Sequence, residues 1–210
     1  MRVLGGAMSG FEFIFTLFGL LIGFCLVEVL GGFAKAVEAR FRSNKDRAEV
    51  TRLGWLTPLL GIYVLLDITS FWGAAWIARD QISVSMPVLF AGLVFGGSYY
   101  LAAHAVFPSD PQQHAELDSH YFMVRKWVFG ILTILLVVQI IYWLSVPQLA
   151  ARFGGPLEFA RDVLLPIGLM VAAMVTKSRV VSIILLSMMI ASYLYDYVGH
   201  DLLIALGVTS

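Results

Sequence analysis

Long apolar runs separated by short polar segments are the main pattern along this chain. A transmembrane helix needs roughly 20 mostly apolar residues, each adding about 1.5 Å of length. Five runs meet that length, and a sixth reaches it only by including Glu158, Arg161 and Asp162. The pattern predicts an all-α integral membrane protein, a bundle of six transmembrane helices in a single domain. The expected spans are residues 13–33, 53–77, 86–107, 127–146, 157–176 and 180–198.

The composition favours an exterior that faces lipid. Of the 210 residues, 60% are hydrophobic and 13% are charged, and the mean hydropathy is +0.86. Soluble domains carry about 25% charged residues, so the charges here are too few to cover a surface in water. Fourteen basic residues balance fourteen acidic ones, which excludes a general attraction to nucleic acid. The lone Cys25 rules out an intrachain disulfide.

The distribution of basic residues predicts the orientation in the membrane. Ten lysines and arginines fall on the side that holds the loops after spans one, three and five, and four fall on the other side. Basic residues concentrate on the cytoplasmic side. We therefore expect both termini to lie outside, in a plasma membrane of the bacterial inner-membrane type. Residues 34–52 are expected to extend the first helix into solvent.

Two pairs of glycines have the spacing of a helix-packing motif. Gly19 and Gly23 are four residues apart in the first span, and Gly92 and Gly96 are four apart in the third. Small residues at this spacing allow helix backbones to approach closely in a bilayer. These glycines are candidates for contacts within the bundle or for a homo-oligomer interface.

Polar groups within the spans are the candidate functional residues, since charges at bilayer depth cost several kcal/mol and mark functional sites. Glu28 and His104 lie near the cytoplasmic ends of spans one and three. At equal depth, they are expected to point into the bundle and approach one another. Asp67, Gln139 and Asp196 form a deeper group.

Asp67 is the strongest of these candidates. Tyr63, Ser70 and Ala74 share its helix face at i−4, i+3 and i+7. No lysine or arginine lies within the apolar part of any span, and burial disfavours a charged carboxylate. We expect Asp67 to be protonated, wholly or in part, near neutral pH. A structural and a functional role are equally weighted for Asp67, whereas structural roles are favoured for the other four polar residues.

Two further groups of titratable residues lie outside the apolar runs. Histidine with carboxylates binds transition metals, but the spacing of His114, Glu116, Asp118 and His120 matches no known metal motif. The acidic residues could equally cap the helix that begins near Tyr121. Asp196 and His200, at i and i+4, are expected to form an ion pair. No metal or other cofactor is indicated.

The sequence leaves three functions open. The first is a pathway for a small solute or an ion, with proton coupling through Asp67, and its support is the intramembrane carboxyl. The second is a non-catalytic membrane subunit that packs with itself or with a larger complex. The third, a membrane enzyme, has the least support, because the chain has no HExxH or GxSxG motif.

An internal repeat would favour the first function. Local similarities between the two halves include Pro58–Gly61 in the second span and Pro166–Gly168 in the fifth. Three spans per half would make the halves antiparallel, the 3+3 inverted arrangement of many transporters. Apolar segments also match by chance, so a bundle without a repeat is the alternative.

Overall fold

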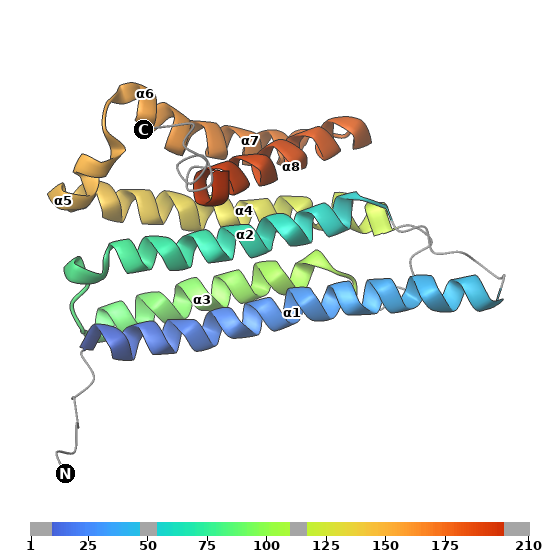
Figure 1. Ribbon diagram of the computed structural model, residues 1–210, viewed down its shortest axis with the longest axis horizontal. Coiled ribbons are helices and arrows are strands. Elements are labelled where there is room, and N and C mark those ends of the chain that lie inside the picture. Colours follow the sequence, from blue (N-terminus) through green and yellow to red (C-terminus); the bar gives the residue numbers. More distant parts are fainter. Residues whose placement is uncertain (1–9, 47–53, 110–116, 200–210) are drawn as a thin grey trace, which may run out of the picture.

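The computed structural model describes residues 10–46, 54–109 and 117–199 of the chain. Every regular element in these ranges is helical (Figure 1). Four long helices come first and four shorter ones follow, with 3₁₀ and π turns between them. The helices are α1 (Gly10–Asp46), α2 (Leu56–Ile77), α3 (Met86–Val106), α4 (Leu117–Ser145), α5 (Pro147–Ala150), α6 (Pro156–Phe159), α7 (Leu165–Val175) and α8 (Arg179–Leu194). The turns are the 3₁₀ turns η1 (Arg79–Gln81) and η3 (Ala151–Phe153) and the π turns η4 (Ala160–Leu164) and η5 (Tyr195–Gly199).

Prolines mark where several helices begin. Pro87, Pro147 and Pro156 stand in the first turns of α3, α5 and α6, where the missing N–H of proline costs no intrahelical hydrogen bond. Gly154 follows η3 with a φ of 61°. Glycine adopts this left-handed backbone without steric cost, and the chain turns there toward α6.

Pro166 accounts for the π turn that precedes α7. The segments α6, η4 and α7 follow one another without a gap. Within a helix, a proline removes one hydrogen bond, and its ring collides with the carbonyl four residues earlier, here that of Asp162. Asp162 lies in η4. A π turn at this point allows the helix to continue past the lost hydrogen bond and the crowded carbonyl. The expected span 157–176 is therefore helical but interrupted.

Five helical stretches in the described residues are long and apolar enough to cross a membrane. They agree with five of the six expected spans, although α4 begins well before Trp127. The expected extension of the first helix beyond residue 33 is present, since α1 continues to Asp46. The interrupted helix at 156–175 is not among the five, so a sixth span and a 3+3 arrangement remain predictions. The five stretches are Glu12–Glu38, Leu56–Ile77, Met86–Val106, Asp118–Ser145 and Arg179–Tyr197.

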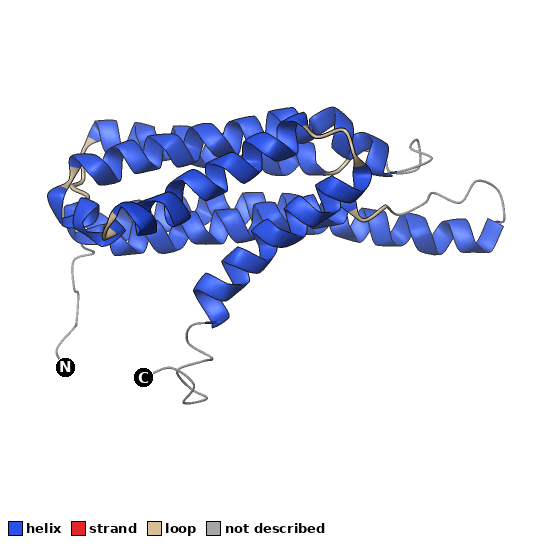
Figure 2. Cartoon of the chain, turned by 90° about the horizontal axis from the view of Figure 1, so that it is seen from above, coloured by secondary structure: helices blue, strands red, loops and turns tan. Residues whose placement is uncertain are grey.

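The long helices lie side by side and alternate in direction (Figure 1). α1 packs along α3, α3 along α4, α7 on α4 and α8 on α2. Seen from above, α8 crosses the bundle obliquely and its C-terminal end points away from the other helices (Figure 2). We call the end of the bundle that holds Leu56, Val106 and Arg179 the inner end, and the end that holds Ile77 and Met86 the outer end.

Three of the four motif glycines are used for packing within the chain. A Cβ on Gly92 would lie 1.6 Å from the Phe18 ring, and one on Gly96 would lie 2.7 Å from Leu21. A Cβ on Gly19 would lie 2.7 Å from Trp72. These contacts allow α1 to approach α3 and α2 closely. Gly23 differs, because nothing lies within 4 Å of the position of its Cβ.

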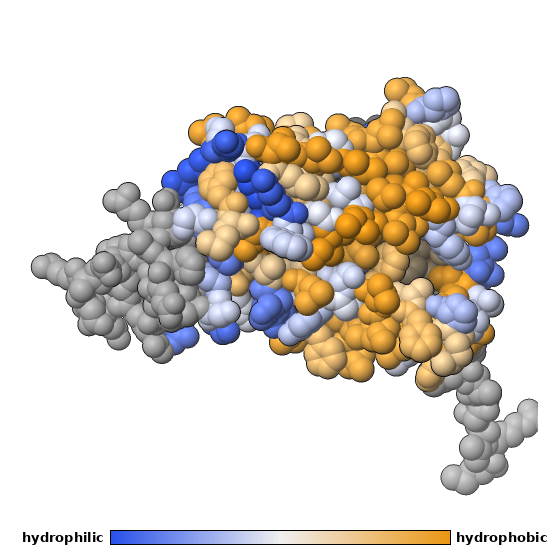
Figure 3. Space-filling view, turned by 180° about the vertical axis from the view of Figure 1, so that it is seen from behind, coloured by the Kyte–Doolittle hydropathy of each residue, from blue (hydrophilic) through white to orange (hydrophobic). Residues whose placement is uncertain are grey.

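The exterior of the bundle is largely apolar, as is expected of a surface that faces lipid. Hydrophobic residues cover most of the rear face, and hydrophilic residues gather toward the ends of the long axis (Figure 3). Exposed tryptophans lie at both ends, with Trp55 at the inner end and Trp76 at the outer end. This is the expected position for aromatic side chains at a membrane interface. Exposed apolar side chains include Leu20, Phe24, Phe90, Leu101, Ile134 and Ile184.

Candidate functional site

Asp67 lies in the middle of α2 and is 7% exposed. Tyr193 of α8 donates its hydroxyl proton to Asp67 Oδ1 across 2.6 Å. The hydroxyl of Tyr99, on α3, also interacts with this carboxyl group. In the part of the chain that the structure describes, no lysine, arginine or histidine is paired with Asp67. Three helices thus meet at a buried carboxyl group whose partners are hydroxyls.

A third tyrosine completes this group. The ring of Tyr63, on α2, is 5.8 Å from that of Tyr193 and 5.7 Å from that of Phe129. Tyr63 is fully buried, and its hydroxyl interacts with that of Tyr193. We call Asp67, Tyr63, Tyr99 and Tyr193 the tyrosine cluster. Its hydroxyls can both donate and accept hydrogen bonds, so the cluster can stabilise the carboxyl group with or without its proton.

Among the described residues, hydroxyl contacts continue from the cluster toward the outer end. Ser70 Oγ and Tyr197 Oη are 2.8 Å apart, and the ring of Tyr197 stacks on that of Tyr193 with 6.2 Å between centroids. Tyr197 is exposed. Toward the inner end, α2 and α8 contribute the buried apolar side chains of Leu60, Val64, Leu186 and Met189. The buried polar side chains of Thr57 and Ser182 lie beyond this apolar layer.

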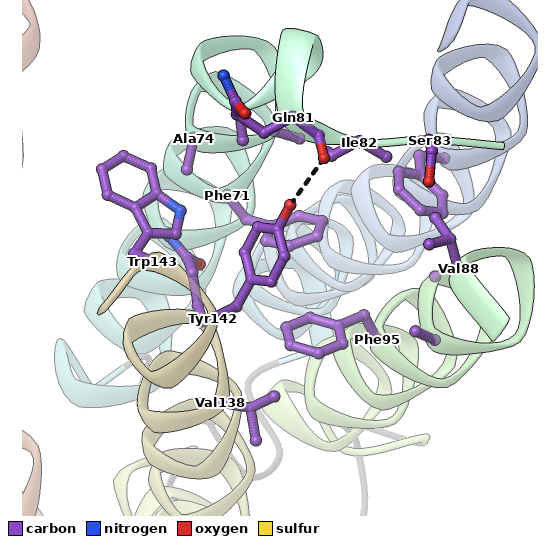
Figure 4. A pocket seen from close by; sticks show the side chains of 16 residues that line it. Phe71, Ala74, Gln81, Ile82, Ser83, Val88, Phe95, Val138, Tyr142 and Trp143 are labelled. Carbon is purple, nitrogen blue, oxygen red and sulfur yellow. Dashed lines mark hydrogen bonds between the residues drawn. The ribbon is translucent and has the colours of Figure 1, made fainter. Parts of the chain in front are cut away.

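A cavity of about 390 Å³ lies on the outer side of the cluster, between α1, α2, α3 and α4. Gln139 lines this cavity, as do Tyr142, Trp143 and Phe71 (Figure 4). The Phe71 ring is 5.3 Å from that of Tyr99. A single aromatic contact therefore separates the cavity from the tyrosine cluster.

The expected pairing of Glu28 with His104 is confirmed. Glu28 Oε1 and His104 Nδ1 are 2.8 Å apart across the contact between α1 and α3. The expected orientation into the bundle is wrong, because the His104 side chain is 58% exposed. His104 lies in the last turn of α3, where its ring stacks on Tyr100 at the surface.

The deeper group does not come together. Asp67 belongs to the tyrosine cluster and Gln139 to the cavity, whereas Asp196 is exposed on η5. Among the described residues, Asp196 interacts electrostatically with Arg161 and Asp162 of η4. Asp196 is separate from the cluster because its side chain lies on the exposed side of η5, whereas Tyr197 of the same turn contacts Ser70 of α2. The partner expected for Asp196, His200, lies outside the described residues.

Two titratable residues of the segment 114–120, for which metal binding was the less favoured interpretation, hold helices together. Asp118 Oδ1 accepts a hydrogen bond from the backbone N of Leu56 across 3.0 Å, and its Oδ2 lies 2.5 Å from Arg179 Nη2. His120 Nε2 is 3.1 Å from the carbonyl of Ala105. Asp118 therefore caps α2 rather than its own helix. His114 and Glu116 lie outside the described residues, and the described part of the chain holds no cluster suited to a metal.

Arg125 is a second buried charged residue of α4. Arg125 is 5% exposed; its Nη1 donates to the carbonyl of Ala173 across 3.2 Å, and its guanidinium lies over the Phe122 ring at 5.0 Å. Together, Asp118, Arg125 and Arg179 link α4 with α2, α7 and α8. Their role is therefore structural.

No protein-family model, curated protein or solved structure matches this chain. The chemistry of the sites is therefore the basis for a functional proposal. Of the sites described, the tyrosine cluster and the adjoining cavity combine a titratable group with space for a small molecule.

The sequence pattern identified the acid of this site but not its partners. Tyr193 and Tyr197 are four residues apart in one helical run of the sequence, and this spacing beside an aspartate on another span was the available signal. Tyrosines near span ends are common as interfacial anchors, which hid that signal. Tyr142 and Trp143 also lie near the end of an expected span, 127–146, where interfacial anchors are common, yet both line the cavity.

Proposed function

We propose that this chain forms a pathway through the membrane for a small solute or an ion, coupled to protons, with Asp67 as the group that binds and releases the proton. The observation that carries the proposal is the environment of Asp67: a carboxyl group in the middle of a candidate span, buried among hydroxyls and without a basic partner in the described residues. Isolated ionisable groups at this depth are costly and serve proton relays in pumps and transporters.

The contacts around Asp67 support a route for the proton toward the outer end. Tyr193 contacts the carboxyl directly, and Tyr197 with Ser70 extends the hydroxyl groups to an exposed position. The apolar layer on the inner side, which includes Leu186, interrupts this route. In the proposed cycle, α8 moves relative to α2 so that Asp67 is reached from one side at a time. The interrupted helix 156–175 serves as a sixth span in this proposal, and an inverted 3+3 arrangement would be consistent with it.

The test compares Asp67→Asn with the wild type in proteoliposomes. Asparagine keeps the shape of the side chain but does not titrate, so proton flux driven by a solute gradient should be abolished while thermal unfolding stays unchanged. Asp196→Asn is the matched control, since Asp196 is also acidic but exposed, and it should retain flux. The infrared band of a protonated carboxyl group should also disappear in Asp67→Asn. Full pH-dependent flux in Asp67→Asn would contradict the proposal.

The alternative of a non-catalytic subunit that packs with itself has less support. Its sequence argument was the two glycine pairs, and Gly19, Gly92 and Gly96 face side chains of their own chain. Gly23 alone among the four has open space at its Cβ position. A homo-oligomer through this part of α1 remains a proposal, which the mass of the protein in native membranes would test.

A further inference from the structure

The cavity at the outer end has a lining without charge. None of the residues that line its volume of about 390 Å³ is acidic, basic or histidine. Moving an ion from water into such surroundings without a compensating partner is strongly unfavourable. Volumes of roughly 300–1,000 Å³ are typical of sites for small molecules. The cavity is thus of a size and polarity for a neutral molecule rather than an ion.

The walls of the cavity are shaped by rings and by very small side chains. Phe71 of α2 and Phe95 of α3 stack with an interplanar angle of 17° and 5.4 Å between centroids. Tyr142 and Trp143 of α4 lie across from the helix that carries Phe95 (Figure 4). Between these rings, the lining of α2 and α3 consists largely of alanine and glycine, namely Ala74, Ala75, Ala78, Ala91 and Gly92.

This combination favours a flat, ring-bearing occupant. Aromatic rings prefer offset-stacked or edge-to-face contacts with one another, and alanine and glycine leave room for a ring without adding bulk of their own. Rings on several sides provide more such contacts to a flat molecule than to a flexible chain.

The polar groups of the cavity add a second requirement. No hydrogen bond among the described residues engages the side-chain amide of Gln139, which lines the cavity. The hydroxyl of Tyr142 is used only weakly, because it donates to the carbonyl of Gln81 across 3.4 Å. The Gln139 side chain is half-buried. An amide both donates and accepts, and an occupant that covers it without offering a hydrogen-bonding group costs free energy. An alkyl chain would leave the Gln139 amide unpaired.

We infer that this cavity binds a neutral, flat, ring-bearing small molecule with a hydrogen-bonding oxygen, which is held by stacking on its aromatic walls and by the amide of Gln139. The inference names the substrate class of the proposed pathway and rests on that proposal for its transport role. The connection is structural: Phe71 lines the cavity and contacts Tyr99, which interacts with Asp67. Occupancy of the cavity would alter the packing of the tyrosine cluster.

The test measures equilibrium binding of radiolabelled 1-naphthol to the full chain in nanodiscs, with protein-free nanodiscs subtracted. Saturable binding to one site is expected. Ala75→Leu and Ala91→Leu fill the cavity from two different helices, and each should weaken binding at least about tenfold. Gln139→Leu should weaken 1-naphthol binding about 2- to 12-fold, the equivalent of one hydrogen bond, and leave naphthalene binding unchanged.

Matched controls separate the cavity from the rest of the membrane surface. Ala191→Leu makes the same change at an exposed position on α8 and should bind 1-naphthol like the wild type. 1-Naphthoate carries a charge on the same ring system and should show no saturable binding. Thermal unfolding of each variant identifies any that fails to fold, and the two cavity-filling positions provide independent readings.

Three results would overturn the inference: no saturable binding of 1-naphthol, binding that neither cavity-filling variant reduces, or displacement by 1-octanol as effective as by unlabelled 1-naphthol. The last result would identify a site for lipid chains. In this design, the binding inference and the proposed pathway can be rejected independently of one another. Asp67→Asn should still bind 1-naphthol, so binding without flux would reject the pathway and retain the site, whereas Asp67-dependent flux without binding would reject only the site.

Discussion

The hydroxyl of Tyr193 matters at the scale of single residues because it is the closest partner of the Asp67 carboxyl, at 2.6 Å. Tyr193→Phe removes this bond and the interaction with the Tyr63 hydroxyl, and it keeps the ring. We expect the free energy of unfolding in detergent to fall by about 0.6–1.7 kcal/mol, the range from the average to the largest hydrogen bonds measured between membrane helices. Tyr197→Phe removes the exposed bond to Ser70 and should cost less. An equal loss in both variants would contradict the special position of Tyr193.

A second prediction at the scale of single residues concerns Glu28 and His104, which form an exposed pair rather than a buried one. Their side chains are 34% and 58% exposed, so solvent or headgroups screen the pair. A double-mutant cycle with Glu28→Gln and His104→Ala should give a coupling energy of about 0.2–1 kcal/mol. Denaturant unfolding of the four proteins would measure it. A coupling energy above about 2 kcal/mol would show that the pair is shielded from water.

At the scale of elements, Asp118 joins the start of α2 to α4 and α8. Its Oδ1 accepts from the backbone N of Leu56 and its Oδ2 faces Arg179. Asp118→Ala removes a helix cap and an ion pair, which together contribute about 1–3 kcal/mol. Asp118→Asn keeps an acceptor for Leu56 N and should cost less than about 1 kcal/mol. Unfolding of both variants would be compared with that of Asp80→Ala, in which only an exposed pair with Arg79 at 3.8 Å is lost.

At the scale of the whole molecule, the alternating helices place Ser109 at the inner end and Ser83 at the outer end, both exposed. The basic residues predict that the inner end faces the cytoplasm. After replacement of Cys25, a cysteine at position 83 should react with a membrane-impermeant maleimide added outside intact cells. A cysteine at position 109 should react only after the membrane is opened. Reaction of position 109 in intact cells would reverse the predicted orientation.

The features of the site that could be predicted from the sequence are those that depend on a single helical run. Asp67 is unusual within its own apolar run, and Glu28 and His104 share a depth that follows from residue counting alone. The direction in which the Glu28 and His104 side chains point does not follow from residue counting. His104 is exposed because of the way in which α3 is rotated against α1, and the rotation depends on where Gly92 and Gly96 admit Phe18 and Leu21. No single run contains that information.

The sequence by itself determined which segments can cross a membrane, because the cost of exposing a peptide group or a charge to lipid is a local property of each run. It also determined where helices begin at prolines, for the same local reason. The tertiary structure alone decided which polar groups meet. Tyr193 and Asp67 are 126 residues apart in the chain, and their contact depends on the tilt of α8 across α2. That tilt is set by side-chain packing between helices, and so are the cavity beside Phe71 and the placement of Asp196 outside the bundle.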